Sequence, residues 1–61
     1  MTFVCIGDRV CWQTDYGPVW LTNMDCERLL DVFQRAGAAR LFNELHTAHV
    51  QAGGVERRMV A

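Results

Sequence analysis

The stretch TNMDCERLLDVFQRAGAARLFNELHTAHVQ, residues 22–51, decides the fold. Apolar residues recur in it at steps of three and four on both sides of Gly37, which is the spacing of one face of a helix. Gly37 can adopt the left-handed conformation that ends a helix, and the joint around it is short. We therefore predict two helices, over 23–36 and 38–51, packed as an antiparallel hairpin.

The first of these helices carries signals for its own beginning. The Thr22 hydroxyl can accept a hydrogen bond from the backbone N–H of Asp25, and the Asp25 carboxylate can return one, as in a capping box. Asp25 and Glu27 place negative charge in the first turn, where the helix dipole favours it. Asp31 and Arg35 are spaced as an i,i+4 ion pair. These features predict that the helix begins directly after Thr22.

The residues before Thr22 follow a period of two, and β-branched and aromatic side chains are frequent among them. Gly7-Asp8 is typical of a two-residue hairpin turn, and residues 15–18 form a second cluster of turn-forming residues. We predict strands over 2–6, 9–14 and 18–21. The predicted fold class is α+β, a three-stranded antiparallel meander packed on a helical hairpin.

The turn lengths predict a register. A two-residue turn at 7–8 pairs Phe3 with Trp12, and a four-residue turn at 15–18 pairs Trp12 with Leu21 and Thr14 with Val19. Directly opposed residues share a face of the sheet. The face expected to pack on the helices then holds Phe3, Cys5, Val10, Trp12, Val19 and Leu21.

The opposite face of the sheet is expected to carry Val4, Ile6, Arg9, Cys11, Gln13 and Trp20. This set is too apolar for a surface that only meets water, and exposed patches of this type often mark interaction sites. We therefore expect Trp20 to contact either a partner protein or a second copy of the chain.

We expect residues 1–52 to form a single compact domain and residues 53–61 to form a flexible C-terminal tail. A chain of 61 residues buries only about 60% of its unfolded surface, so few side chains can lie in the core. The expected core comprises Phe3, Val10, Trp12, Leu21, Leu29, Leu30, Phe33, Leu41, Phe42 and Leu45.

Composition excludes several classes of function. The net charge is −1 and lysine is missing, so no strongly basic surface is available and direct nucleic-acid binding is not expected. No stretch approaches the ~20 apolar residues of a membrane span. A secretion signal is not expected either, and the three cysteines then predict reduced thiols and a cytoplasmic location.

The histidines and cysteines do not predict a metal site. His46 and His49 are three residues apart on the second helix, but no Cys-x-x-Cys motif accompanies them. Cys5 and Cys11 fall on opposite sheet faces in the predicted register, and Cys26 falls on the core face of its helix. We expect no metal, no cofactor and no catalytic residue, and therefore a protein that is not an enzyme.

These exclusions leave a small protein-binding domain. The chain is similar in profile to phage- or mobile-element-encoded inhibitors of host protein complexes, anti-CRISPR proteins among them. Two alternatives are a small DNA-binding transcriptional or plasmid regulator and a zinc-stabilised module. The expected partner is a host protein or protein complex, and a homodimer is also considered. The residues expected to bind the partner are Arg9, Asp15, Tyr16, Trp20, Glu27 and Asp31.

Overall fold

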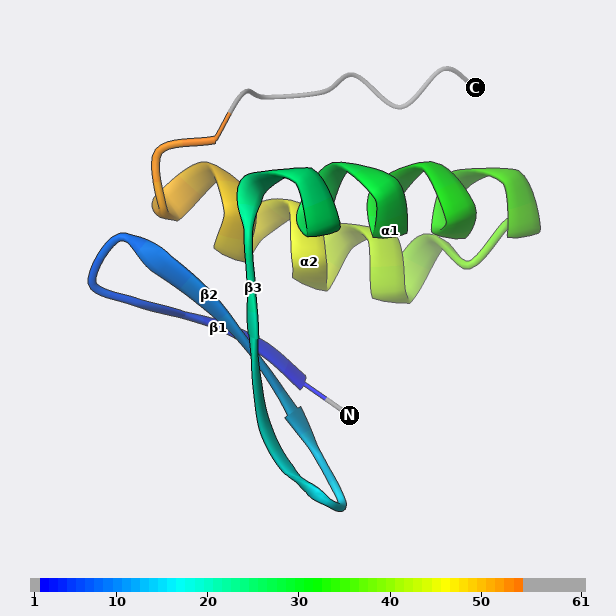
Figure 1. Ribbon diagram of the computed structural model, residues 1–61. Helices are drawn as coiled ribbons and strands as arrows, with labels where there is room; N and C mark the ends of the chain where they lie inside the picture. The colour runs from blue at the N-terminus through cyan, green and yellow to red at the C-terminus, as the bar shows by residue number, and fades with distance from the viewer. Residues whose placement is uncertain (1, 55–61) are drawn as a thin grey trace.

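The computed structural model describes residues 2–54, in which three strands precede two helices. The strands form one antiparallel sheet in the order β1-β2-β3, and both helices lie on the same side of it (Figure 1). The predicted βββαα arrangement is confirmed, and each predicted boundary agrees to within one residue. The elements are β1 (Thr2–Ile6), β2 (Arg9–Thr14), β3 (Gly17–Leu21), α1 (Asn23–Ala36) and α2 (Ala39–Gln51).

Helix α1 has a defined beginning and end. The Thr22 hydroxyl accepts a hydrogen bond from the Asp25 N–H, and the Asp25 carboxylate accepts one from the Thr22 N–H, each at 3.1 Å. Gly37 follows the helix at φ 70°, and the N–H of Ala38 reaches back to the carbonyl of Phe33 at 2.9 Å. Both predicted caps are therefore confirmed, and they hold the helix between the sheet and the joint.

The register of the first hairpin is as predicted, but that of the second is shifted by two residues. Trp12 pairs with Val19 and Thr14 pairs with Gly17, because the turn contains two residues and not four. Gly17 adopts φ 118°, which lets it begin the strand, and Pro18 is accommodated in β3 because β3 is an edge strand. A shift of two preserves the face of every side chain, so the two predicted faces are retained.

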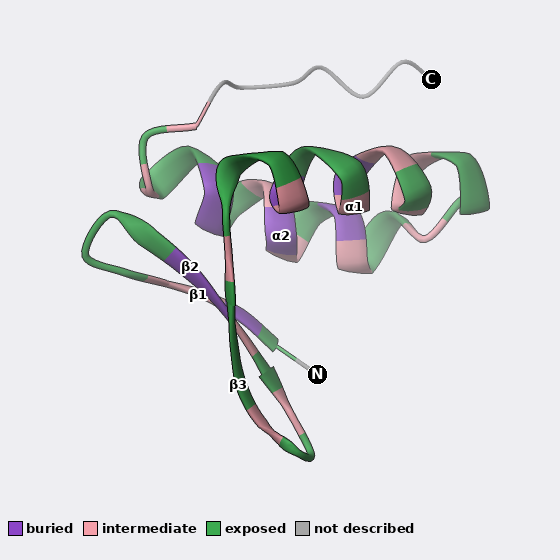
Figure 2. Cartoon of the chain, viewed as in Figure 1, coloured by how far each residue is buried: buried purple, intermediate pink, exposed green. Residues whose placement is uncertain are grey.

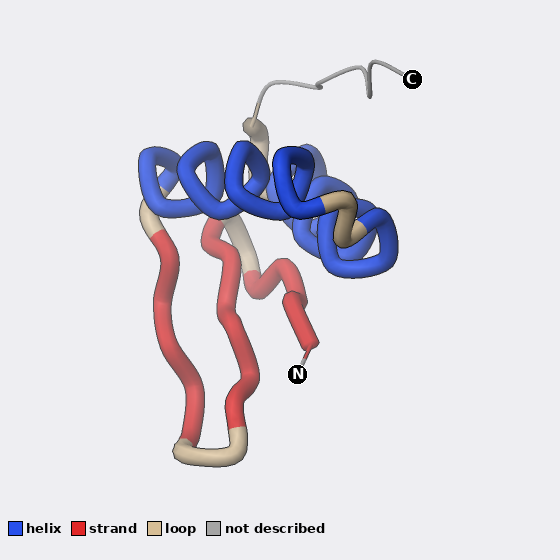
Figure 3. The backbone as a smooth tube through the Cα atoms, turned by 90° about the vertical axis from the view of Figure 1, so that its right-hand side faces the viewer, coloured by secondary structure: helices blue, strands red, loops and turns tan. Residues whose placement is uncertain are grey.

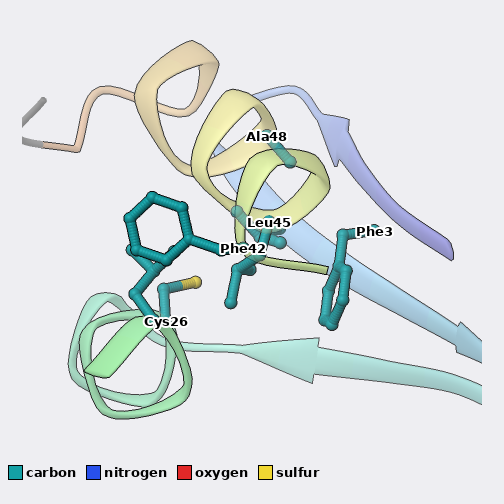
Figure 4. Packing of buried hydrophobic residues seen from close by; sticks show 7 residues of the cluster. Phe3, Cys26, Phe42, Leu45 and Ala48 are labelled. Carbon is teal, nitrogen blue, oxygen red and sulfur yellow. The ribbon is translucent and has the colours of Figure 1, made fainter. Parts of the chain in front are cut away.

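The core lies between the helices and the sheet. Figure 4 shows Phe42 and Leu45 of α2 between Cys26 of α1 and Phe3 of β1. Of the ten predicted core residues, five are buried (Phe3, Val10, Leu30, Phe42 and Leu45). The other five are only half-buried and pack against this cluster (Trp12, Leu21, Leu29, Phe33 and Leu41). On the sheet, the helices cover too little surface to bury Trp12 and Leu21 completely.

His49 is buried among apolar residues, with 1% of its surface exposed. Neither ring nitrogen has a hydrogen-bond partner within residues 2–54. The backbone of Gly54 lies directly on the imidazole ring, and its N–H donates to the His49 carbonyl at 2.8 Å. A Cβ at position 54 would overlap the ring, so the close approach requires glycine there.

The burial of Leu30 yields the first prediction. Leu30→Ala should lower the free energy of unfolding by about 2–5 kcal/mol, because it leaves a cavity where α1 meets α2 and the sheet. Chemical denaturation measures this loss, which is a large part of the stability of a small domain.

Val32→Ala is the matched control, since Val32 is on the same helix with 56% of its surface exposed. This substitution should change stability by less than about 0.5 kcal/mol. Equal losses for the two variants would contradict the assignment of the buried face of α1.

Candidate functional site

The hairpin of β2 and β3 extends away from the helices, with its turn at the far end (Figure 3). The turn is held by the Thr14 hydroxyl, which donates to the Gly17 carbonyl at 2.8 Å and accepts from the Tyr16 N–H at 3.2 Å. Tyr16 at this turn is fully exposed. A rigid backbone therefore presents an aromatic side chain that packs on nothing else in residues 2–54.

The face of the sheet away from the helices is the outer face, formed by Thr2, Val4, Ile6, Arg9, Cys11, Gln13, Pro18 and Trp20. Exposed residues predominate along β3, which is mostly green in Figure 2. Trp20 and Ile6 each expose about half of their surface, 51% and 50%. Cys11, between them on the central strand, exposes 1%. The outer face thus has a closely packed apolar centre that no helix covers.

Pro18 determines how Trp20 is presented. Because proline has no N–H, the pair Gln13–Pro18 cannot exchange two hydrogen bonds, and the two kinds of pair alternate along an antiparallel ladder. The pair Cys11–Trp20, two residues on, is therefore also of the kind without mutual hydrogen bonds, in which the side chains approach most closely. This places Trp20 beside Cys11 on the outer face. It also directs the N–H and C=O of Trp20 toward the open edge.

A pocket of about 410 Å³ lies at the end of the hairpin nearest the helices. It combines the turn after β1, the end of β3 and the first residues of α1, because Val10 and Leu21 are paired. The pocket mixes an exposed cation, an aromatic ring and small polar groups. Its lining residues are Asp8, Arg9, Val10, Trp20, Leu21, Thr22, Asn23 and Ala52.

The six residues predicted to bind a partner do not form one site. Arg9 and Trp20 share the outer face and line the pocket. Asp15 and Tyr16 lie at the opposite end of the hairpin. The remaining two acidic residues, Glu27 and Asp31, are on α1, and the carboxylate of Asp31 pairs with Arg35 at 3.3 Å. The hairpin therefore gathers four of the six.

Sequence reasoning missed the contribution of Asp8, Thr22 and Asn23 to the pocket. Each has a local role in the sequence, as a turn residue or as part of a helix start. With a two-residue turn at 15–16, Leu21 pairs with Val10 and brings the helix start beside the first turn. The correct length of the second turn was the signal that could have located the pocket.

Among residues 2–54, two titratable groups have shifted pKa values, and both belong to α1. The hydrogen bonds from the Thr22 backbone and side chain lower the pKa of Asp25 below its ordinary 3.8, and Arg28 acts in the same direction. Burial raises the pKa of the Cys26 thiol above its ordinary 9.0, and the charges of Asp25 and Glu27 raise it further. The first keeps the cap ionised and the second makes the thiol a poor nucleophile.

The three cysteines are free thiols, and Cys5 and Cys11 point to opposite faces of the sheet. Within residues 2–54, no group of three or more histidine, cysteine or acidic side chains is placed to hold a metal ion. His46 stacks on Phe42 with ring centroids 5.6 Å apart, and His49 is enclosed in the core. The histidines and cysteines of the described residues are therefore placed as packing residues and not gathered into one cluster.

Comparisons with protein-family models, with curated proteins and with solved structures find no match to this chain. Among the described helices, neither has the length and apolar character needed to cross a membrane.

The thiols yield the second prediction. Under native conditions an alkylating reagent should label Cys5 first, because Cys11 and Cys26 each expose 1% of their surface. Intact mass should show one label on the folded protein and three after denaturation without reductant. Rapid native labelling of Cys11 would contradict the packing of Trp20 over it.

Proposed function

We propose that the chain is a small non-enzymatic domain that binds another protein through the β2–β3 hairpin. The observation that carries the proposal is the full exposure of Tyr16 at the tip of the hairpin, in a turn whose backbone is held by two hydrogen bonds of the Thr14 hydroxyl. A large aromatic side chain that is fully exposed to water gains no hydrophobic stabilisation until another surface covers it. Tyrosine is among the residue types that contribute most to protein interfaces, since it loses little conformational entropy on binding.

Neighbouring features of the hairpin support the same proposal. Asp15 adds a charge at the tip, and within the described residues it has no ion-pair partner. At the other end, the pocket beside Arg9 and Trp20 is wide enough for one side chain of a partner. The hairpin thus offers one projecting contact and one concave contact.

The proposed partner is a host protein or protein complex, and the proposed role is inhibition by a phage or mobile element, as anti-CRISPR proteins do. The profile supports this role: a single 61-residue chain with a net charge of −1 and no lysine. Such a domain has little room for chemistry, but it can occlude the surface of a larger machine. A cytoplasmic location belongs to the same proposal.

The third prediction tests the hairpin tip. The tagged chain should capture a host protein from a nuclease-treated extract, and the purified partner should then bind with measurable affinity. Tyr16→Ala should weaken that binding by at least about 2 kcal/mol, close to thirtyfold, as expected for an interface hot spot. Calorimetry with the purified components measures the effect.

Val50→Ala provides the control, because Val50 is an exposed apolar residue on α2, which lies at the end of the molecule opposite the hairpin tip (Figure 3). Both substitutions should leave the melting temperature almost unchanged. If Tyr16→Ala binds as tightly as the control, the hairpin tip is not the contact. Binding that disappears on nuclease treatment would favour a nucleic-acid role instead.

A further inference from the structure

The outer face changes character from one end of β2 to the other. Arg9 begins the strand on this face, Cys11 and Gln13 follow on the same face, and Asp15 lies beyond the last paired residue, in the turn at the tip. Within residues 2–54, neither Arg9 nor Asp15 has an ion-pair partner. The two unpaired charges of opposite sign are therefore separated by about 20 Å of strand, along which the outer face carries Cys11 and Gln13.

The centre of this face is apolar across all three strands. Val4, Cys11 and Trp20 lie side by side in one row, and Pro18 lies two residues before Trp20 on β3. The helices pack on the opposite side, and within this row Trp20 is half-exposed whereas Cys11 exposes only 1% of its surface. A face with a positive end, an apolar centre and a negative end is complementary to itself when one copy is turned end over end.

We propose that the outer face docks a second copy of this chain, with the two sheets face to face and their strands antiparallel. A two-fold axis between the sheets, perpendicular to the strands, places β2 over β2 and β3 over β3. Arg9 of each copy then faces Asp15 of the second copy. The same operation places Trp20 over Pro18 of the second copy, which covers the half-exposed indole with an apolar ring.

The charges select this arrangement over the other two-fold one. An axis parallel to the strands would place Arg9 over Arg9 and Asp15 over Asp15, with like charges opposed at both ends. Asp8, in the turn next to Arg9, weakens the contrast at that end but does not reverse it. Opposed like charges across paired surfaces are destabilising, so the antiparallel arrangement is favoured.

The size of the face sets the strength of the contact. Three strands of about five residues cover roughly 14 by 17 Å. The area of this face is well below the ~800 Å² per partner of a standard interface. The dimer is therefore weak, with a dissociation constant in the range of about 10 µM to 1 mM. A domain with so small a core gains from such a contact, because association covers surface that the chain cannot bury alone.

Sedimentation equilibrium on the purified chain alone, from about 10 µM to 1 mM, tests the proposal. The expected result is reversible dimerisation. Arg9→Asp and Asp15→Arg should each weaken it at least about tenfold, since each opposes like charges twice across the two-fold axis. The double variant Arg9→Asp/Asp15→Arg should restore dimerisation to within about threefold of the wild type, because both pairs are re-formed with their signs exchanged.

Two further variants complete the experiment. Trp20→Ala should weaken the dimer at least about tenfold by removing the apolar contact at its centre. Glu27→Arg, a matched reversal of an exposed charge on α1, should leave it unchanged. Thermal melts of all variants confirm that the monomer is folded, and the charge variants keep the test valid if Trp20→Ala is unstable.

A chain that stays monomeric up to about 1 mM overturns the proposal and leaves the outer face to a different protein. Dimers that the double variant fails to restore overturn the antiparallel arrangement. The inference does not depend on the host partner proposed above, because it is measured without that partner. Loss of capture by Tyr16→Ala with no dimer supports the function alone, and the reverse result supports the dimer alone.

Discussion

The packing of the helical hairpin on one side of the sheet is the interaction on which the rest of the structure depends. Leu30 and Leu45, both with no exposed surface, join the two helices to each other and to the strands. The apolar stripe of each helix needs an apolar surface to pack on, and one face of the three-stranded sheet supplies it. Once that face is used, residues 2–54 contain no further layer for the other. The half-exposed Trp20 lies on the face that the two helices leave uncovered.

A core this small also contains polar groups at a cost. Trp12 stacks on Phe3 with ring centroids 5.4 Å apart, but its indole N–H is buried without a hydrogen-bond partner in the described residues. Both nitrogens of His49 are in the same situation. An unsatisfied buried polar group costs about 1–3 kcal/mol. Since the total stability of such a domain is small, these groups leave little reserve, and covering additional apolar surface by association would offset them.

Much of the fold could be predicted because each element has a local cause. The change from a period of two to one of 3.6 occurs at Thr22, and a capping box stands there. The predicted length of the second turn was wrong because glycine and proline usually mark turns, whereas Gly17 and Pro18 begin an edge strand. The site was predictable only in part. Residues on one hairpin could be grouped, but the pocket depends on Val10 lying opposite Leu21, which is a tertiary fact.

Substitutions at the two ends of the β2–β3 hairpin are expected to have different effects. Near the helices, Val10 is buried and Leu21 packs against the core, so substitutions there act on folding. At the tip, Tyr16 is fully exposed and Asp15 is unpaired within the described residues. Substitutions there are therefore expected to affect the proposed binding and not folding. Trp20 lies between the two ends of the hairpin, where it is half-exposed and paired with the buried Cys11. A substitution of Trp20 is therefore expected to affect both the packing of the sheet and any contact that the outer face makes, because the residue is opposed to a buried thiol and is itself half-exposed.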